Sequence, residues 1–304
     1  MATTFEVLLP YGLPDALEMA EAALNEIDRL EDQLSVYRDH SEVSGLNRRA
    51  DREAVPVEEH LFELLCLSAR ITDETAGAFD VTAGALSKAW GFYRRHGRVP
   101  TEAERAEALS RVGMRHLEVN RETCTVRFLQ PGLEINLGSI GKGYALDRAA
   151  ELLRSQWNPP AALLHGGHSS VYAIGSEPGD DRGWAVGIRH PWKPDRRLGI
   201  VRLCDRALGT SAATFQHLEH DGRKLGHILD PRTGWPAEGM ASVSVVAPTA
   251  AEADALATAF FILGVEKARS YCEMHKDIGA VLLPDGARTP VLIGLERDEI
   301  ELGT

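Results

Sequence analysis

The spacing of apolar and polar positions predicts several helices along this chain. Between Leu13 and Ser35 the apolar residues recur at near-heptad intervals, which is typical of a helix with one face in the core; they are Leu17, Ala20, Leu24, Ile27, Leu30 and Leu34. Similar apolar periods and helix-start residues predict further helices over residues 56–75, 82–92, 102–112, 145–156, 249–263 and 265–275.

Shorter apolar runs between these segments predict strands. They cover residues 5–10, 161–164, 170–174, 184–188, 199–201, 242–247 and 280–283, and residues 117–128 alternate as a hairpin does. Long helices combined with antiparallel-looking strands favour the α+β class. A chain of 304 residues without repeats is long enough for one large domain or for two intimate subdomains.

Composition and charge exclude several classes of protein. Hydrophobic residues make up 44% and charged residues 26%, which is ordinary for a globular chain. A net charge of −12 argues against binding to nucleic acid or to an anionic membrane. No apolar run is long enough for a transmembrane helix. The N-terminus shows no signal peptide and no lipobox cysteine, so we expect a cytoplasmic protein or a trimmed N-terminus.

The cysteines and histidines do not form a recognisable metal motif. Cys66, Cys124, Cys204 and Cys272 are scattered without a C-x-x-C pair, so small buried thiols are expected, although three disulfide pairings are formally possible. A zinc site built from histidines is an alternative, but it lacks a supporting cysteine or carboxylate pattern; its candidates are His165, His168, His217 and His220.

A glycine-rich turn is the most informative feature of the sequence. The segment from Glu134 to Asp147 reads as a short strand, three glycines with Lys142 between the last two, and then a helix. Glycines allow the backbone to approach a ligand, and a helix N-terminus beside a lysine attracts phosphate. The spacing matches neither a Walker loop nor G-x-G-x-x-G, so a purely structural turn is the alternative. Arg232 is a second candidate cation for an anionic ligand.

Two further segments carry candidate chemistry. Residues 227–236 place His227, a carboxylate, an arginine and a threonine in a turn with two prolines. Thr249 and Glu252 then form a capping-box pattern that predicts a helix start. Asp254 and Thr258 lie four residues apart on one face of that helix, and both offer the hard oxygen ligands that Mg²⁺ prefers. The alternative is that Asp254 only stabilises the helix N-terminus.

Together these segments resemble the ApbE-like FAD:protein FMN transferases over nearly the whole chain. Five blocks occur in the family's order. They are residues 34–47; residues 77–82 with Leu86 and 90–92; the glycine-lysine turn; residues 165–168 with 184–191; and Gly209–Ser211 with the His227 turn and Ala253–Thr258. One such block would be weak, but five in register are specific.

The resemblance implies a T-fold-like antiparallel sheet with packed helices, and Mg²⁺-dependent transfer of FMN from FAD to a threonine or serine of a partner flavoprotein, with AMP released. It also implies residue roles. Gly141 through its carbonyl, Asp254 and Thr258 match the metal site. His227 matches a histidine implicated in transfer, and Asp254 serves catalysis through the metal. The FAD-binding positions are Leu34, Ala78, Phe79, Asp80, Gly138, Lys142, Tyr144 and Leu229.

The sequence also departs from the family pattern. Residues 210–215 replace the usual Thr-Ser-Gly-acidic-aromatic run, Gly226 replaces a serine, and His168-Ser-Ser170 replaces a run that often begins with Asn or Asp. These changes leave two alternatives open beside transfer. One is an FAD pyrophosphatase, in which water takes the place of the acceptor hydroxyl, and the other is a protein that binds FAD without catalysis.

Overall fold

The computed structural model describes residues 3–94, 97–212, 217–220, 223–296 and 298–303, and the chain forms two compact units. Unit 1 comprises residues 1–31, 140–214 and 239–304, and unit 2 comprises residues 32–139 and 215–238. The expectation of one domain, or of two intimate subdomains, stays a prediction.

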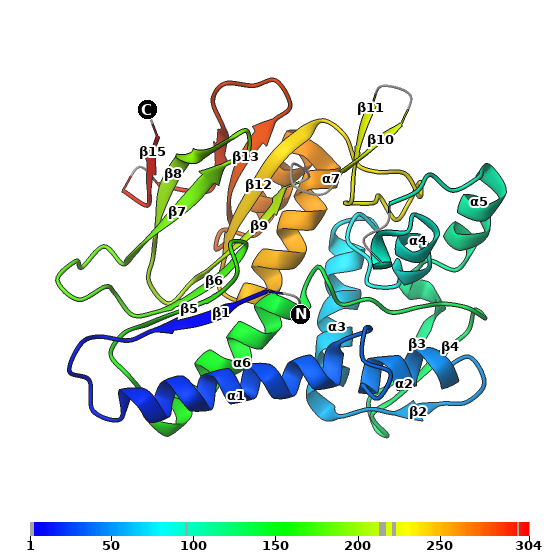
Figure 1. Ribbon diagram of the computed structural model, residues 1–304, viewed down its shortest axis with the longest axis horizontal. Coiled ribbons are helices and arrows are strands. Elements are labelled where there is room, and N and C mark those ends of the chain that lie inside the picture. The colour runs from blue at the N-terminus through cyan, green and yellow to red at the C-terminus, as the bar shows by residue number, and fades with distance from the viewer. Residues whose placement is uncertain (1–2, 95–96, 213–216, 221–222, 297, 304) are drawn as a thin grey trace. The chain divides into compact units, whose positions relative to one another are not determined.

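Unit 1 is built on a seven-stranded antiparallel sheet in the order β1-β5-β6-β9-β12-β13-β14 (Figure 1). Its strands are β1 (Phe5–Leu8), β5 (Ala162–Gly166), β6 (Ser170–Ile174), β9 (Ala207–Ala212), β12 (Met240–Ala247), β13 (Gly279–Pro284) and β14 (Val291–Ile293). A three-stranded antiparallel sheet contains β7 (Trp184–His190), β8 (Lys193–Leu203) and β15 (Ile300–Leu302).

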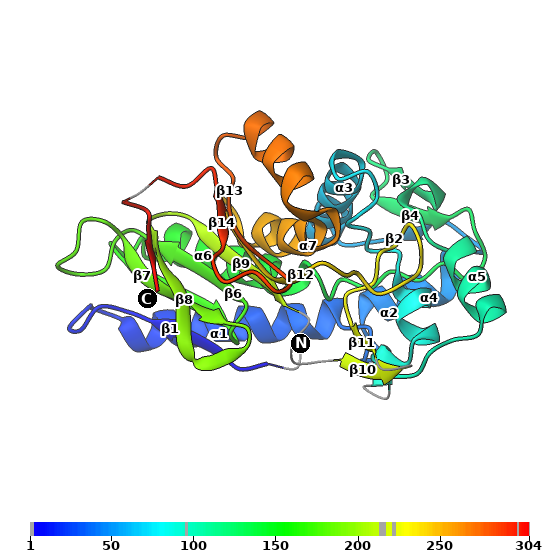
Figure 2. The same cartoon turned by 90° about the horizontal axis from the view of Figure 1, so that it is seen from above.

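Two helices, α6 (Gly141–Gln156) and α7 (Ala250–Met274), pack against each other and against the large sheet (Figures 1 and 2). Buried side chains of the two sheets form a common core that includes Trp184, Val201 and Leu283. Unit 1 therefore has helices, a large sheet and a small sheet in layers, which confirms the α+β class with an antiparallel sheet core.

Unit 2 is mainly helical. Its helices are α2 (Glu42–Arg49), α3 (Glu59–Glu74), α4 (Gly84–Ala89) and α5 (Glu102–Ser110), with 3₁₀ turns at Phe92–Arg94 and Met114–His116. The strands β2 (Val55–Pro56), β3 (Leu117–Asn120) and β4 (Thr125–Phe128) form one small sheet, and β10 (His217–His220) pairs with β11 (Arg223–Gly226). The expected hairpin at residues 117–128 is confirmed by the β3–β4 pairing.

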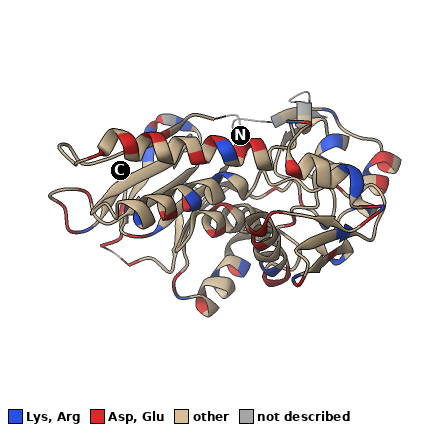
Figure 3. Cartoon of the chain, turned by 90° about the horizontal axis from the view of Figure 1, so that it is seen from below, with Lys and Arg blue, Asp and Glu red and all other residues tan. Residues whose placement is uncertain are grey.

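Helix α1 (Ala16–Leu34) confirms the first expected helix and the C-terminal half of its expected inner face, where Ile27, Leu30 and Leu34 are buried. The buried positions are Met19, Ala23, Ile27, Leu30 and Leu34, whereas Leu17 is 72% exposed. The reason is that an α-helix repeats every 3.6 residues, so a stripe through Leu34 and Ile27 reaches Met19 rather than Leu17. Acidic residues recur along the outer side of α1, among them Glu18, Glu21 and Asp28 (Figure 3).

The break between the two C-terminal helices is confirmed. Gly264 has φ 76° and ψ −178°, so α7 is interrupted at the residue that separates the expected segments 249–263 and 265–275. A left-handed φ favours glycine, which explains why the interruption occurs at this position. All four cysteines are free thiols, but of the four only Cys272 is buried, so the expectation of small buried thiols is only partly confirmed. Among the described residues, no helix has the length and apolarity needed to cross a bilayer.

Candidate functional site

A buried carboxylate meets the N-terminus of a helix in unit 1. Asp254, in the second turn of α7, is 5% exposed, and its Oδ2 accepts a hydrogen bond from the Gly143 amide of α6 at 2.9 Å. The Ser170 hydroxyl of β6 lies 2.8 Å from Oδ1 and 2.9 Å from Oδ2. Asp254 therefore does not serve its own helix N-terminus, as the structural alternative held, but contacts the start of another helix.

Lys142 supplies the nearest positive charge. Its Nζ lies 3.9 Å from Asp254 Oδ2, and its side chain remains 25% exposed. Burial raises the pKa of the Asp254 carboxyl, while Lys142 and the hydrogen bonds from Ser170 and Gly143 oppose that shift. At this helix N-terminus the carboxylate is a group that can bind a cation, and the ammonium is a group that can bind an anion.

Thr258 lies one turn beyond Asp254 and shares its face of α7, as the spacing indicated. Its hydroxyl contacts the Asp254 carbonyl at 3.3 Å and the Ser211 hydroxyl of β9 at 3.1 Å. These carboxylate and hydroxyl oxygens fit a hard cation such as Mg²⁺. Gly141 fits less well, because it is the first residue of α6 and a carbonyl in a helix points toward the C-terminal end. Its assignment as a metal ligand stays a prediction.

The starts of α6 and α7 are in direct contact. A Cβ atom on Gly143 would lie 2.0 Å from the Ala250 carbonyl oxygen, so only glycine fits. Asp147 of α6 accepts hydrogen bonds from the Ala250 and Ala251 amides of α7, at 2.7 and 2.8 Å. Helix α6 begins at Gly141, earlier than the expected residue 145, because Gly141 and Gly143 form part of its first turn.

The start of α7 has the residues of the expected capping box. The Thr249 hydroxyl accepts a hydrogen bond from the Glu252 amide at 3.2 Å, and it donates to the Glu252 carboxylate at 3.0 Å. The N-cap assignment of Thr249 is therefore confirmed.

In unit 2, the segment Ala78–Asp80 forms a buried turn. The side chains of Ala78 and Phe79 are buried, Phe79 to 1% exposure, so both contribute to the core of this unit. Asp80 accepts hydrogen bonds from the Thr82 amide at 2.8 Å, from the Thr82 hydroxyl at 2.6 Å and from the Met114 amide at 3.1 Å. Burial raises the pKa of the Asp80 carboxyl against these three hydrogen bonds. The carboxylate thus stabilises this turn, and its contact with flavin stays a prediction.

The turn that carries His227 is fixed by several hydrogen bonds. The Trp90 indole donates to the Gly234 carbonyl at 2.9 Å, and Arg105 donates to the Thr233 carbonyl at 2.8 Å. Arg232 forms a two-pronged pair with Asp230, with contacts of 2.9 and 2.8 Å. Arg232 is therefore hydrogen-bonded to a carboxylate, whereas the Lys142 Nζ lies 3.9 Å from Asp254, beyond hydrogen-bond distance, so Lys142 is the better candidate for an anionic ligand. His227 itself is half-buried.

The remaining predicted flavin residues have varied environments. In unit 2, Leu34 is buried, Leu229 packs on the apolar cluster of α4 and α5, and Gly138 is exposed with its amide bonded to the Asn136 side chain at 2.9 Å. In unit 1, Tyr144 lies in the first turn of α6 and is half-buried. The structure thus brings Gly141, Lys142, Tyr144, Asp254 and Thr258 together in unit 1.

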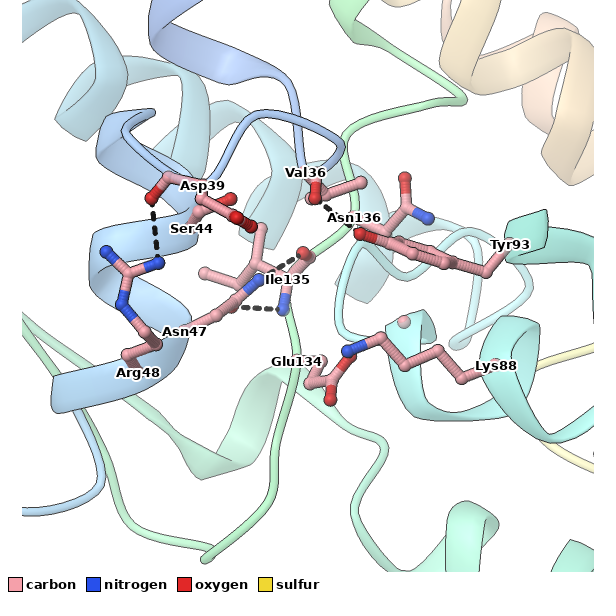
Figure 4. Close-up of a pocket in the computed structure, with 11 residues that line it drawn as sticks. Val36, Asp39, Ser44, Asn47, Arg48, Lys88, Tyr93, Glu134, Ile135 and Asn136 are labelled. Atoms are coloured by element: carbon pink, nitrogen blue, oxygen red, sulfur yellow. Dashed lines mark hydrogen bonds and ion pairs between the residues drawn. The ribbon is translucent and has the colours of Figure 1, made fainter.

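Unit 2 also contains a polar pocket of about 240 Å³ (Figure 4). Its lining comes from the first and third sequence blocks and from residues next to the second; it includes Val36, Asn47, Lys88, Tyr93, Glu134 and Asn136. Asn47 exchanges hydrogen bonds with the Ile135 backbone in both directions, at 2.9 and 2.8 Å, and so holds two of these segments together. Lys88 pairs with Glu134 across the pocket at 2.6 Å.

Sequence reasoning missed several residues of these sites. Ser170 and Asp147 contact partners on other elements, and nothing in their local spacing indicated this. Part of the unusual run 210–215 lies outside the described residues, whereas Ser211 is described and contacts Thr258. Among the described residues, no group of three or more His, Cys, Asp or Glu side chains is arranged to hold a metal, so the zinc alternative gains no support.

Comparisons with known proteins agree with this geometry. The sequence profile of the ApbE family matches residues 1–282. The chain belongs to the ApbE family. It is 32% identical over 270 residues to an FAD:protein FMN transferase of Klebsiella pneumoniae, covering 87% of this chain and 82% of the relative. It is 34% identical over 283 residues to the protein of the same name from Treponema pallidum, covering 87% and 78%.

Solved structures of ApbE proteins have the same fold. The crystal structure of the ApbE protein from Thermotoga maritima aligns with a TM-score of 0.86 and 30% identity, over 96% of this chain and 94% of that one. The apo form of the flavinyl transferase ApbE from Pseudomonas stutzeri aligns with a TM-score of 0.83 and 25% identity, over 97% and 95%. The family assignment made from the five sequence blocks is therefore confirmed.

Proposed function

We propose that this ApbE-family chain transfers FMN from FAD to a threonine or serine hydroxyl of a partner flavoprotein, with Mg²⁺ bound and AMP released. The observation that carries the proposal is the position of Lys142 beside the buried Asp254 at the start of α6, 3.9 Å apart. This arrangement, in a chain whose relatives are named FAD:protein FMN transferases, suits a substrate with a pyrophosphate and a divalent cation.

Each group in unit 1 has a role in this proposal. The Lys142 ammonium and the N-terminal end of α6, which begins at Gly141, bind phosphate oxygens. Asp254 and Thr258 hold Mg²⁺ on one face of α7, with the Gly141 carbonyl as the third proposed ligand. The bound cation supplies charge neutralisation during phosphoryl transfer. Ser170 keeps the Asp254 carboxylate oriented through bonds of 2.8 and 2.9 Å.

Unit 2 supplies the proposed flavin and proton-transfer residues. Leu34, Ala78, Phe79, Asp80, Gly138 and Leu229 are proposed to bind the flavin. Tyr144 of α6 is a further proposed flavin residue. His227 is proposed to accept the proton of the incoming hydroxyl as a general base. The acceptor oxygen then bonds to the phosphorus of the FMN half, the bond from that phosphorus to the bridging oxygen of the pyrophosphate breaks, and AMP leaves.

The test is incubation of the protein with FAD, Mg²⁺ and an acceptor that carries an Asp-x-x-Ser/Thr-Gly/Ser-Ala-Ser/Thr sequence. Covalent flavin is read as in-gel fluorescence, and AMP is measured in the same sample. The matched control replaces the last Ser/Thr of the acceptor with alanine. We expect both signals with the acceptor and no fluorescent band with the control.

The same experiment separates the two alternatives. AMP release without a fluorescent acceptor would identify an FAD pyrophosphatase and would overturn transfer. Bound FAD without AMP would identify a protein that binds FAD without catalysis. Asp254→Asn, which removes the negative charge of the proposed metal ligand, serves as the inactive enzyme control.

A further inference from the structure

Helices α6 and α7 each carry an aspartate whose carboxylate accepts hydrogen bonds from amides at the N-terminal end of the other helix. Asp147 reaches from the second turn of α6 to the first two amides of α7, at 2.7 and 2.8 Å. Asp254 reaches from the second turn of α7 to the Gly143 amide in the first turn of α6, at 2.9 Å. Each helix therefore provides an anion to the positive end of the other, where backbone amides lack partners within their own helix.

Side-chain oxygens accept hydrogen bonds from three backbone amides in the first turn of α7. Asp147 satisfies the Ala250 and Ala251 amides, and the Thr249 hydroxyl satisfies the Glu252 amide at 3.2 Å. Among the described residues, Asp147 is the only residue of another element whose side chain accepts a hydrogen bond from the first-turn amides of α7. The position of this helix end depends on Asp147.

The contact between the helix starts leaves little room for adjustment. Gly143 lies so close to Ala250 that an added Cβ would meet the Ala250 carbonyl oxygen at 2.0 Å. A Cβ on Gly209 would likewise lie 2.4 Å from the Ala253 carbonyl carbon and 2.5 Å from the Asp254 amide nitrogen. The first turn of α7 is therefore packed closely against two backbone segments.

A displacement at Ala250 reaches Asp254 directly. The two residues are one turn apart, about 6 Å along a rigid helix, so the carboxylate moves with the helix start. Asp254 Oδ2 lies at hydrogen-bond distance from Gly143 and Ser170, and 3.9 Å from Lys142. A shift of about 1 Å is enough to break the hydrogen bonds of this set.

From this geometry we infer that Asp147 is a positioning residue for the cation site, because it fixes where α7 begins and so where Asp254 and Thr258 stand. This inference rests on the proposed function, which assigns Mg²⁺ to Asp254 and Thr258. Asp147 itself is not among the proposed metal ligands; its two oxygens accept the hydrogen bonds of the Ala250 and Ala251 amides. Residues that orient metal ligands from behind typically change metal affinity 10–100-fold when replaced.

The test compares Mg²⁺ binding by the full-length parent and by Asp147→Asn, using isothermal titration with Mg²⁺ alone at pH 8. Asparagine has the same shape but lacks the charge and the second acceptor oxygen. We expect the Mg²⁺ dissociation constant to rise roughly tenfold. In assays of AMP release, the Mg²⁺ concentration for half-maximal rate should rise by the same factor, with a smaller change in the rate at saturating Mg²⁺.

Thr101→Ala is the matched control for a general loss of stability. Thr101 caps α5 of unit 2 in a complete capping box, so its loss removes a helix cap without touching the groups around Asp254. We expect this variant to be less stable by about 1 kcal/mol and to bind Mg²⁺ as the parent does. A weaker affinity in both variants would show that stability, rather than position, controls binding, and it would overturn the inference.

Two further outcomes are decisive. If the parent binds Mg²⁺ and Asp147→Asn binds it equally, the positioning role is overturned while the proposed function stands. If the parent binds no Mg²⁺, the proposed metal site is overturned and this inference with it. Should Asp147→Asn not fold, Asp147→Glu retains the charge on a chain one methylene longer. The positioning role then requires weaker Mg²⁺ binding by that variant, and equal binding overturns it.

Discussion

The Gly143 amide donates a hydrogen bond to the Asp254 carboxylate across 2.9 Å, although 111 residues separate the two in sequence. Gly143 makes this contact possible because it has no Cβ, which allows the first turn of α6 to meet the Ala250 carbonyl of α7. The glycine-rich turn therefore has a structural task in addition to any ligand that it binds.

The first prediction concerns this glycine. Gly143→Ala places a methyl group against backbone atoms that cannot rotate away, so we expect a loss of roughly 1–3 kcal/mol in the free energy of unfolding. Gly45→Ala is the matched control, because Gly45 also lies in a helix but its added Cβ would meet only Arg48 Nη2, at 3.9 Å. That variant should gain roughly 0.5–1 kcal/mol. Urea unfolding of both variants measures the difference, and equal effects would contradict the packing argument.

The second prediction concerns Asp254. Asp254→Asn keeps a hydrogen-bond acceptor but removes the negative charge. We therefore expect the Mg²⁺-dependent release of AMP to be abolished while the fold remains intact. Asp254→Ala should also lose about 1–3 kcal/mol of stability, because it leaves the Ser170 hydroxyl and the Gly143 amide without their acceptor. Rates measured over a series of Mg²⁺ concentrations check the first effect, and an unchanged metal dependence would remove Asp254 from the metal site.

Helix α7, which carries Asp254 and Thr258, has some features that the sequence predicted and some that it did not. The Thr249 cap, the shared face of Asp254 and Thr258 and the break at Gly264 all follow from local chemistry, since caps, helical periods and left-handed glycines depend on neighbouring residues. The partners of Asp254 do not, because Gly143 and Ser170 come from distant elements. Tertiary contacts of this kind leave no periodic signal in the sequence.

Of the elements that the sequence did not predict, two have weak signals for related reasons. The strand β9 (Ala207–Ala212) consists of small residues with a single leucine, so it lacks the β-branched run that identifies a strand, and its pairing with β6 and β12 stabilises it. Helix α2 (Glu42–Arg49) is short and contains Gly45, which weakens the helical signal. Strand pairing stabilises β9, and the Ser41 cap stabilises α2.

The third prediction separates two roles of Asp80. If the carboxylate binds flavin, Asp80→Ala should weaken FAD binding by about 1–3 kcal/mol, the cost of losing a buried polar partner. Thr82→Val is the control, because it removes the Thr82 hydroxyl from the same turn and leaves the carboxylate in place. Calorimetric titration with FAD distinguishes the roles. Equal losses of affinity in both variants would mean that Asp80 acts only by stabilising the turn.

The fourth prediction concerns the pH dependence of stability. Burial raises the pKa of Asp147 to about 7, and the negative charges of Asp254 and Glu252 add to the shift, while the amides of Ala250 and Ala251 oppose it. The folded state therefore retains a proton that the unfolded chain releases near its ordinary pKa of 3.8. Stability from this group is fully present below pH 4 and is lost as the pH rises through about 7.

The measurement compares urea unfolding of the parent and Asp147→Asn at pH 5 and pH 8. Because asparagine does not titrate, the parent should lose stability relative to the variant between these pH values, by an amount on the order of 3 kcal/mol. The other ionisable groups are common to both proteins and cancel in this comparison. A difference that does not change with pH would show that Asp147 titrates in its ordinary range.

The last prediction concerns His227. This half-buried histidine lies at the start of a turn that hydrogen bonds from Trp90 and Arg105 hold in place. As a general base for the acceptor hydroxyl, its loss in His227→Ala should slow FMN transfer by roughly 10²–10⁴-fold. The affinity for FAD should change little, because the base acts on the incoming hydroxyl. Added imidazole should restore part of the rate, since a small base can enter the space left by the side chain.

His60→Ala provides the control for this experiment, because His60 is an exposed histidine at the start of α3, far along the sequence from the turn. It should transfer FMN at the parent rate, with or without imidazole. A structural role for His227 predicts a different pattern, in which FAD affinity falls together with the rate and imidazole has no effect. Transfer by His227→Ala at the parent rate would exclude the residue from proton transfer altogether, and the base would then have to be sought among other groups.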